Sequence, residues 1–301
     1  MHRERLVVVG NGMASLRLLE RLGQHAPGRF DVTVVGAEPA PAYNRVLLSS
    51  LLARDVAESD CRLRERPWYL RQSVRLITGA AATALDLEER EVVVGELTTL
   101  PFDRLVLATG SDPIRLPRPG MDLPGVITFR DMADVDHMVT AAEKGGDAVV
   151  IGGGLLGLEA AHGLTLRGMK VTVIHLMPTL MERQLDEAAA WLLRTALEAR
   201  GQTILTEADT AEIVGESHVE GVRLKDGRFI PASLVVMAVG IRPNVALARQ
   251  AGLAVGRGIQ VDDHMVTSDA AILAVGECVE HRRSEERRVG KECRSRWSPY
   301  H

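Results

Sequence analysis

The chain has 301 residues, of which 46% are hydrophobic, 25% are charged and 3% are aromatic. A chain of this length usually forms two domains, and its composition excludes collagen-like, disordered and disulfide-scaffold proteins. With a formal net charge of −4 and so few aromatic side chains, it has neither the basic surface nor the stacking platform that nucleic-acid binding requires.

The first predicted elements form a strand–helix–strand unit. Leu6–Val9 is a continuous apolar run, which is typical of a strand buried in a parallel sheet. The turn Gly10-Asn11-Gly12 separates it from Met13–Leu22, where apolar residues have helical spacing. A second strand, Val32–Val35, leads through a glycine to Glu38. This order predicts a βαβ unit with parallel strands.

The middle of the chain contains shorter elements. Val92–Val94 and Leu105–Ala108 are predicted strands, and four prolines in residues 113–124 exclude a helix or a central strand there. We interpret this proline-containing stretch as a crossover between domains. Asp131 is a candidate N-cap for a helix that runs to Lys144.

The βαβ pattern then returns, and this internal repeat is the most informative feature of the sequence. Ala148–Ile151 is a predicted strand, Leu155–Leu166 a helix, and Val171–Ile174 a second strand. After the repeat we predict a helix at Leu185–Ala199. The remaining predicted strands lie around Ile204, Ile213 and Val222 and at Leu234–Met237 and Ile272–Val275.

The first glycine turn has the residues that a dinucleotide needs. Gly10 makes the tight turn, and Gly12 lets a pyrophosphate approach the backbone at the N-terminus of the helix. Ser15 stands where a third small residue packs the helix on the strand. Glu38, at the end of the second strand, is placed to accept the hydroxyls of an adenosine ribose. The alternative is an ordinary βα turn with an exposed glutamate.

The second turn contains the full Gly-x-Gly-x-x-Gly pattern at Gly152, Gly154 and Gly157. His175 occupies the strand-end position where an acid would hold the ribose. A neutral imidazole can bond a hydroxyl and a protonated one tolerates a 2′-phosphate, so a preference for NADH or NADPH stays open. The alternative for His175 is a surface residue with no ligand.

Five motifs in order give the chain a family resemblance. They are Gly10–Ser15 with Glu38, Ala108-Thr109-Gly110, Gly152–Gly157, Val239–Pro243 and Ala274–Cys278. This order resembles that of the FAD/NAD(P)-dependent pyridine nucleotide oxidoreductases. The resemblance implies an α/β fold with two Rossmann-like dinucleotide-binding domains. Each would have three layers and a parallel central sheet, and the FAD domain would be discontinuous.

The resemblance becomes closer in four further segments. Ala42–Ser50, Gly152–Glu159, Met181–Asp186 and Gly276–Cys278 resemble the N-terminal flavin modules of assimilatory NAD(P)H nitrite reductase large subunits. The likeness covers residues 5 to about 282. It implies an FAD domain at 1–114 and 258–281 and an NAD(P)H domain at 115–257.

The same resemblance implies roles for individual residues. Glu159 corresponds to the glutamate beside the nicotinamide and is the candidate catalytic residue. Arg45 is a candidate phosphate or flavin contact, and Glu277 a contact to the ribityl or phosphate arm. The candidate cofactor-binding residues are Gly10, Gly12, Ser15, Glu38, Arg45, Ala82, Thr109, Gly110, Gly152, Gly154, Gly157, His175, Gly240 and Glu277.

Cysteine usage limits the chemistry and the location. Cys61, Cys278 and Cys293 lie far apart, without a Cys-x-x-Cys pair, so we expect no metal site, no redox dithiol and no disulfide. Three cysteines also cannot supply four thiolates to an iron–sulfur cluster. No signal-peptide core and no apolar stretch of about 20 residues is present. We therefore expect a cytoplasmic protein without a membrane segment.

Three functions remain open from the sequence. The first is an FAD-dependent NAD(P)H oxidoreductase that serves as the electron-input module of a nitrite reductase and passes electrons to iron–sulfur and siroheme domains. The second is a stand-alone reductase for a rubredoxin or ferredoxin, and the third a redox-sensitive flavoprotein scaffold without enzymatic activity. A homodimer is possible in the full-length form. Residues 282–301, rich in charge and with Val289 as their one aliphatic residue, are interpreted as a foreign or disordered tail.

Overall fold

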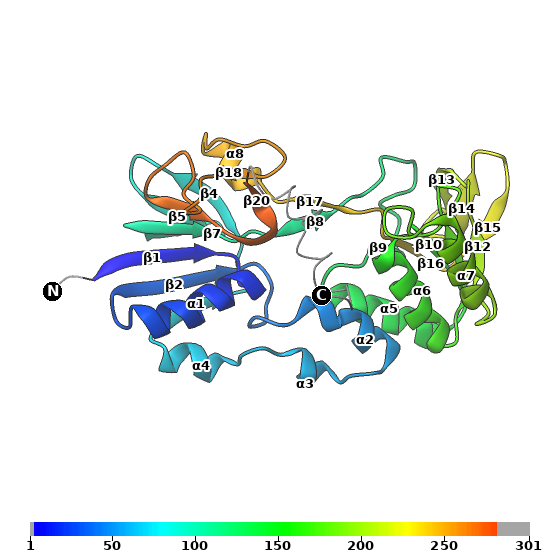
Figure 1. Ribbon diagram of the computed structural model, residues 1–301, viewed down its shortest axis with the longest axis horizontal. Helices are drawn as coiled ribbons and strands as arrows, with labels where there is room; N and C mark the ends of the chain where they lie inside the picture. The colour runs from blue at the N-terminus through cyan, green and yellow to red at the C-terminus, as the bar shows by residue number, and fades with distance from the viewer. Residues whose placement is uncertain (1–2, 282–301) are drawn as a thin grey trace, which may run out of the picture. The chain divides into compact units, whose positions relative to one another are not determined.

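The computed structural model describes residues 3–281, and the predicted tail at 282–301 lies outside them (Figure 1). The described chain forms two compact units. The first consists of residues 3–43, 63–111 and 243–281, and the second of residues 44–62 and 112–242. Each unit contains one of the two predicted βαβ repeats.

The first unit is built on a parallel sheet with strand order β19-β7-β1-β2-β3. The strands are β1 (Glu4–Val9), β2 (Phe30–Gly36), β3 (Val74–Thr78), β7 (Arg104–Leu107) and β19 (Ile272–Ala274). Their apolar, largely β-branched sequences suit strands that are covered on both faces. The helices of this unit are α1 (Met13–His25), α4 (Arg66–Arg71), α8 (Ala246–Gln250) and the single turn η2 (Gly276–Cys278).

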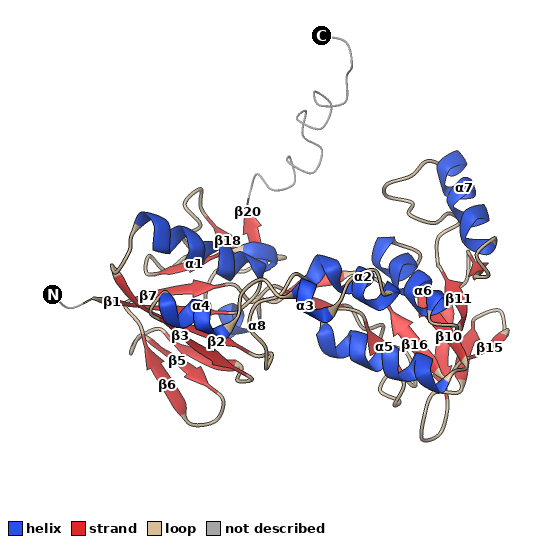
Figure 2. Cartoon of the chain, turned by 90° about the horizontal axis from the view of Figure 1, so that it is seen from below, coloured by secondary structure: helices blue, strands red, loops and turns tan. Residues whose placement is uncertain are grey.

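Alternate side chains of β1 enter two separate cores, as the period of a strand requires. Leu6 and Val8 pack with Leu16 and Leu19 of α1. Val7 and Val9 pack on the other face, where an antiparallel sheet covers them. That sheet consists of β4 (Ala82–Asp86), β5 (Glu91–Val94) and β6 (Thr98–Pro101). Helices, parallel sheet and antiparallel sheet thus form three layers. Figure 2 distinguishes the helices, in blue, from the strands of both sheets, in red.

The second unit repeats this architecture. Its parallel sheet has the order β12-β11-β10-β16-β9. The strands are β9 (Val126–Thr128), β10 (Asp147–Ile151), β11 (Lys170–Ile174), β12 (Thr203–Leu205) and β16 (Leu234–Met237). An antiparallel sheet of β13 (Thr210–Val214), β14 (Gly221–Leu224) and β15 (Phe229–Pro231) shares a core with it. The predicted fold class, α/β with parallel central sheets in two dinucleotide-binding-like halves, is confirmed.

The helices of the second unit are α2 (Leu48–Ala53), α3 (Glu58–Cys61), α5 (Met132–Lys144), α6 (Leu155–Leu166), α7 (Glu187–Glu198) and the turn η1 (Arg45–Leu47). Helix α6 packs on β10, β11 and β16. Helix α5 begins as predicted, because the Asp131 side chain accepts a hydrogen bond from the backbone N–H of Asp134 at 2.9 Å. The remaining elements are two strand pairs, β8 (Ser111–Pro113) with β17 (Ile241–Pro243) and β18 (Ile259–Val261) with β20 (Val279–His281).

The segment 44–62 packs with the second unit, whereas the sequence placed it in the FAD domain. Leu52 fills the space beside Gly163 of α6, where an added Cβ would lie 2.6 Å from its Cγ. Arg167 donates to the carbonyl of Leu52 at 2.6 Å and to that of Leu51 at 3.2 Å. These contacts join residues far apart in sequence, so local pattern could not reveal them.

The chain returns to the first compact unit at residue 243. The expected start of the second FAD-domain segment at residue 258 stays a prediction. Asn244 fixes this return: its N–H donates to Gly110 O at 2.9 Å, and its carbonyl accepts from Thr109 Oγ1 at 2.6 Å. Val245 and Ala248 then enter the core of the first unit.

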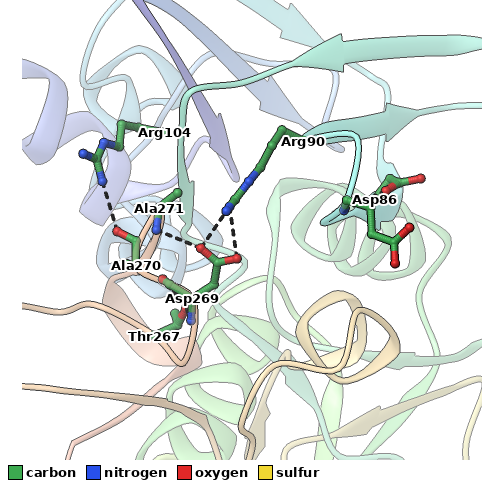
Figure 3. Close-up of polar contacts among 8 residues, drawn as sticks. Asp86, Arg90, Arg104, Thr267, Asp269, Ala270 and Ala271 are labelled. Carbon is green, nitrogen blue, oxygen red and sulfur yellow. Dashed lines mark hydrogen bonds and ion pairs between the residues drawn. The ribbon is translucent and has the colours of Figure 1, made fainter.

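The segment that leads into β19 is held by one carboxylate, shown in Figure 3. Asp269 accepts from Arg90 Nη1 at 2.9 and 3.0 Å and from the Ala271 N–H at 2.8 Å. Arg104 donates to the neighbouring carbonyl of Ala270 at 3.0 Å. Desolvation opposes ionisation of Asp269, but the bonds from Ala271 and Arg90 outweigh it, so the pKa of Asp269 is lowered.

We expect Asp269→Asn to reduce the free energy of unfolding at neutral pH by about 1–3 kcal/mol, because a partly buried charged acceptor is lost. A carboxylate with a lowered folded-state pKa contributes stability above its ordinary pKa of about 4 and loses it as the pH falls through the folded-state value. Urea unfolding should therefore show a difference in the free energy of unfolding between wild type and variant that becomes smaller at acidic pH. Asp226→Asn, which breaks an exposed pair with Arg228, is the control with a smaller effect. If the difference in the free energy of unfolding were as large at acidic pH as at neutral pH, the ionised Asp269 carboxylate would not be its cause.

Candidate functional site

Most of the residues predicted to contact FAD lie at one edge of the first sheet. Residues 10–15 follow β1, Glu38 follows β2, Thr109 and Gly110 follow β7, and Glu277 follows β19. Because all five strands are parallel, these are their carboxyl ends, where α/β sheets bind ligands. Ala82 begins β4, paired with Val94. Arg45 lies in the second unit, where its guanidinium donates to the Arg130 carbonyl at 3.1 Å.

The two glycines of the first turn are glycines for different reasons. Gly10 has φ +108°, and a Cβ there would lie 2.1 Å from the Ala108 carbonyl oxygen. Gly12 has φ −96° and ψ −167°, which any residue adopts. No described protein atom lies within 4 Å of a Cβ built at Gly12. Packing within the protein requires glycine at position 10. At position 12 the described residues do not require glycine, so only a molecule that approaches from outside the chain would.

The N-terminus of α1 suits an anion. The Gly12 N-cap supplies no side-chain hydrogen bond, and the first turn has no acidic residue, so the helix N–H groups and the dipole are available to a phosphate. Asn11 accepts from Tyr69 Oη at 3.0 Å, while its buried Nδ2 has no hydrogen-bond partner among the described residues. Ser15 is buried, and its hydroxyl donates to Gly12 O at 2.9 Å.

Two carboxylates at this edge are held by hydroxyl groups. Tyr43 Oη donates to Glu38 Oε2 at 2.7 Å, and Ser111 Oγ donates to Glu277 Oε2 at 2.7 Å. Gly276 is positioned close to α1, because a Cβ there would lie 3.0 Å from the Cβ of Ala14. The strand-end acid and the acid of the last motif are therefore both oriented by neighbours.

The second turn repeats the contrast in glycine use. Gly152 has φ +124°, with the Ala238 carbonyl oxygen 2.3 Å from an added Cβ, and at Gly157 the Gly152 carbonyl oxygen would lie at 2.0 Å. Gly154 has ordinary φ −83° and ψ 178°, and an added Cβ would have no described atom within 4 Å. It too caps its helix, α6, without a side-chain bond. Gly240 follows β16, and its carbonyl accepts from Ile114 N at 2.9 Å.

His175 lies at the end of β11, as predicted, and is 8% exposed. Its Nδ1 accepts from the Gly153 N–H at 3.1 Å, and its Nε2 lies 3.2 Å from Glu182 Oε2. Both ring nitrogens therefore already have partners within the second unit.

Glu159, the candidate catalytic residue, is in the second turn of α6. It accepts a hydrogen bond of 2.5 Å from the hydroxyl of Ser49, which lies on α2. A hydrogen bond from a hydroxyl group to a carboxylate is charge-assisted and orients the acceptor. Helix α2, clamped to α6 through Leu52 and Arg167, thus presents Ser49 to Glu159.

Neither described cysteine has the character of a redox thiol. Cys61 and Cys278 are both fully buried. Desolvation, with smaller effects of Asp60 and Glu58, raises the pKa of Cys61, which disfavours the reactive thiolate. Within residues 3–281, no three His, Cys, Asp or Glu side chains gather as a metal site, and no helix combines the length and hydropathy needed to span a bilayer.

Sequence reasoning missed the hydrogen-bond partners of three carboxylates, Glu38, Glu159 and Glu277, and of the His175 imidazole. The missed residues are Tyr43, Ser49, Ser111 and Glu182. The family resemblance was a signal that could have pointed to three of them, because its segments contain Tyr43, Ser49 and Glu182. Ser111 directly follows the Ala-Thr-Gly motif, but nothing in the sequence connects it with Glu277.

The chain is similar to known proteins over most of its length. The chain is 50% identical over 94% of its length to "Nitrite reductase [NAD(P)H]" of Bacillus subtilis (strain 168) and 44% identical over 93% to the "Assimilatory nitrate reductase electron transfer subunit" of the same organism. It spans only 35% and 36% of these two proteins.

Among solved structures, the ferredoxin reductase for the CYP199A2 system from Rhodopseudomonas palustris has a TM-score of 0.87 and 28% identity, with 94% of this chain and 70% of that chain covered. The sequence profile described as pyridine nucleotide-disulphide oxidoreductase matches residues 4–292. Since that match covers nearly the whole chain, the protein belongs to the pyridine nucleotide-disulphide oxidoreductase family.

Proposed function

We propose that this chain transfers hydride from NAD(P)H to FAD and passes the electrons to an iron–sulfur or siroheme acceptor, as the electron-input module of a nitrite reductase. One observation carries the proposal: each βαβ unit has a glycine, Gly12 or Gly154, that the fold itself does not need. Close approach of a ligand to the backbone explains a glycine with ordinary dihedral angles and open space around it. The 50% identical relative supports the choice of nitrite reductase.

The residues of the first unit fit FAD. Three features suit a pyrophosphate: the open face at Gly12, the α1 N-terminus without a side-chain cap, and the Asn11 Nδ2, which has no hydrogen-bond partner among residues 3–281. Glu38, held by Tyr43, suits the ribose hydroxyls. Bound FAD would supply the capacity to accept a hydride and release electrons one at a time. The protein's part is to bind, orient and exclude water.

The second unit fits NAD(P)H by the same reasoning at Gly154 and the α6 N-terminus. Glu159 would lie beside the nicotinamide, and its bond from Ser49 would hold the carboxylate in one position. Hydride transfer needs aligned rings more than it needs a proton donor, so this role is orientation.

A redoxin reductase is the second candidate. It is favoured by the likeness to the ferredoxin reductase, of which this chain covers 70%, compared with 35% of the nitrite reductase. In either case the acceptor clusters belong elsewhere, because three cysteines cannot hold a four-thiolate cluster. Dimer formation and a cytoplasmic location stay predictions.

The test is an anaerobic titration of the purified flavoprotein with NADH and with NADPH. The expected result is bleaching of the flavin absorbance, followed by reoxidation with an artificial dye. Reoxidation by rubredoxin or ferredoxin at a rate comparable to that of the dye would favour the redoxin reductase. Flavin that neither nucleotide bleaches, but dithionite does, would contradict both and favour a scaffold.

We expect Ser49→Ala to slow flavin reduction by NAD(P)H about tenfold, because a charge-assisted bond to Glu159 is lost. Nucleotide affinity should stay close to wild type, so that rapid kinetics separate the rate from the binding constant. Ser50→Ala is the matched control on the same helix and should stay within about twofold of wild type. If Ser49→Thr, which keeps the hydroxyl, fails to restore the rate, the hydrogen bond is not the cause.

A further inference from the structure

The end of β11 poses a question that the family pattern does not answer. In a dinucleotide-binding βαβ unit, the acid that receives the adenosine ribose follows the second strand. Here that position is His175, and both of its ring nitrogens are occupied within the second unit. The residue that would receive the ribose must therefore lie elsewhere on this edge.

The hydrogen bonds define the state of the imidazole. Gly153 N–H can only donate, so Nδ1 of His175 accepts and carries no proton. We therefore assign the hydrogen to Nε2, which donates to the Glu182 carboxylate at 3.2 Å. The His175 ring is 8% exposed. Through its two hydrogen bonds it connects the glycine turn to Glu182 and fixes the distance between them.

The loop that carries Glu182 is attached to the same turn. Met181 N–H donates to the Gly153 carbonyl at 3.0 Å. A Cβ at Gly153 would lie 2.6 Å from Leu180 Cδ2 and 2.7 Å from His175 Cγ, so the loop and the ring pack directly on this glycine. Within the loop, the N–H groups of Gln184 and Leu185 return to the Met181 carbonyl at 2.8 and 2.9 Å. Glu182 is thus fixed beside the turn that would hold the pyrophosphate.

We propose that Glu182 receives the 2′- and 3′-hydroxyls of the adenosine ribose, that His175 is its positioning residue, and that the site selects NADH over NADPH. This inference rests on the proposed function of the second unit. The Glu182 side chain is 30% exposed, and only its Oε2 has a hydrogen-bond partner in the described part of the chain. The other oxygen is available to a ribose hydroxyl.

Charge decides between the two nucleotides. A ribose diol donates hydrogen bonds to a carboxylate, whereas a 2′-phosphate brings further negative charge next to it. The one cation in the loop from His175 to Asp186 is Arg183, which is exposed. Its guanidinium would be the contact for a 2′-phosphate if the site selected NADPH. A ribose contact at Glu182 therefore predicts a preference for NADH, whereas a phosphate contact at Arg183 predicts a preference for NADPH.

The experiment measures binding of NAD⁺ and NADP⁺ to the oxidised flavoprotein by calorimetry, which does not depend on turnover. Wild type should bind NAD⁺ at least about tenfold more tightly than NADP⁺. Glu182→Gln should weaken NAD⁺ about tenfold and leave NADP⁺ unchanged or tighter, so that the preference disappears. Arg183→Gln, the matched control, should shift both dissociation constants by the same factor. Equal melting temperatures would show that the variants are folded.

His175 is tested by coupling. His175→Ala should weaken NAD⁺ but not NADP⁺, and it should have no further effect in a chain that already carries Glu182→Gln, because it acts through that carboxylate. Equal affinities in wild type, a preference for NADP⁺, or a parallel change of both nucleotides in Glu182→Gln would overturn the inference while leaving the proposed function intact. Binding of neither nucleotide would overturn both.

Discussion

Replacing Gly154 with valine is expected to reduce the rate of flavin reduction by NAD(P)H by at least about 100-fold, because two or more charge-assisted bonds to the pyrophosphate would be lost. The added methyl groups would occupy the space above the turn, where no described protein atom lies within 4 Å of a Cβ. Stopped-flow measurement under anaerobic conditions gives this rate directly. Dithionite should reduce the flavin of the variant as it does that of wild type.

The fold should tolerate this change. Gly154 has φ −83° and ψ 178°, so valine adopts the backbone without strain, and its poorer N-cap propensity costs about 1 kcal/mol. Gly152→Ala is the control: it places a Cβ 2.3 Å from the Ala238 carbonyl at φ +124°, and we expect a loss of stability above about 3 kcal/mol. If Gly154→Val is reduced at the wild-type rate, no pyrophosphate approaches this backbone.

The second large effect is expected at the equivalent position of the first unit. Gly12→Val should purify with less than about a tenth of the wild-type flavin, since a loss of two charge-assisted bonds weakens binding by roughly 100-fold or more. Absorbance of the denatured protein against a flavin standard measures this stoichiometry. Full occupancy would show that the first glycine turn does not bind FAD.

Stability must be compared between forms without flavin, because a ligand that binds the native state stabilises it by mass action. Deflavinated wild type and Gly12→Val should then unfold at similar urea concentrations, because a Cβ at position 12 meets no described atom within 4 Å. Gly10→Ala should fold poorly, as its Cβ would lie 2.1 Å from the Ala108 carbonyl oxygen. Gly154→Val is a further control, since it should retain flavin and lose only nucleotide-dependent reduction.

Local sequence was sufficient for the two βαβ repeats. Helix α6 has the predicted limits, Leu155 and Leu166, and the strands and helices of both repeats lie within a few residues of the expected ones. Apolar β-branched runs define parallel strands, and glycines define the turns between strand and helix. Both signals act over a few residues and depend little on the rest of the fold. Each glycine motif directly follows a predicted strand in the sequence, so its position at the carboxyl end of that strand could be predicted.

The hydrogen-bond partners of the candidate carboxylates were decided only by the tertiary structure. Ser49 and Glu159 are 110 residues apart, and Ser111 and Glu277 are 166 apart. The hydroxyl groups that meet these acids have no periodic or spacing signature in the sequence. Glu182 is near His175 in sequence, but its position beside the imidazole depends on a loop that folds back onto Gly153.

The sequence by itself determined that the chain has two βαβ repeats in parallel sheets, which glycine turns follow their first strands, and which family it resembles. The tertiary structure decided that residues 44–62 pack with the second unit, that the first unit resumes at residue 243, and which neighbour orients each acid. Strand and turn propensities are encoded by adjacent residues. Which unit a segment packs against, and which side chains form hydrogen bonds, depend on distant segments that become neighbours only when the chain has folded.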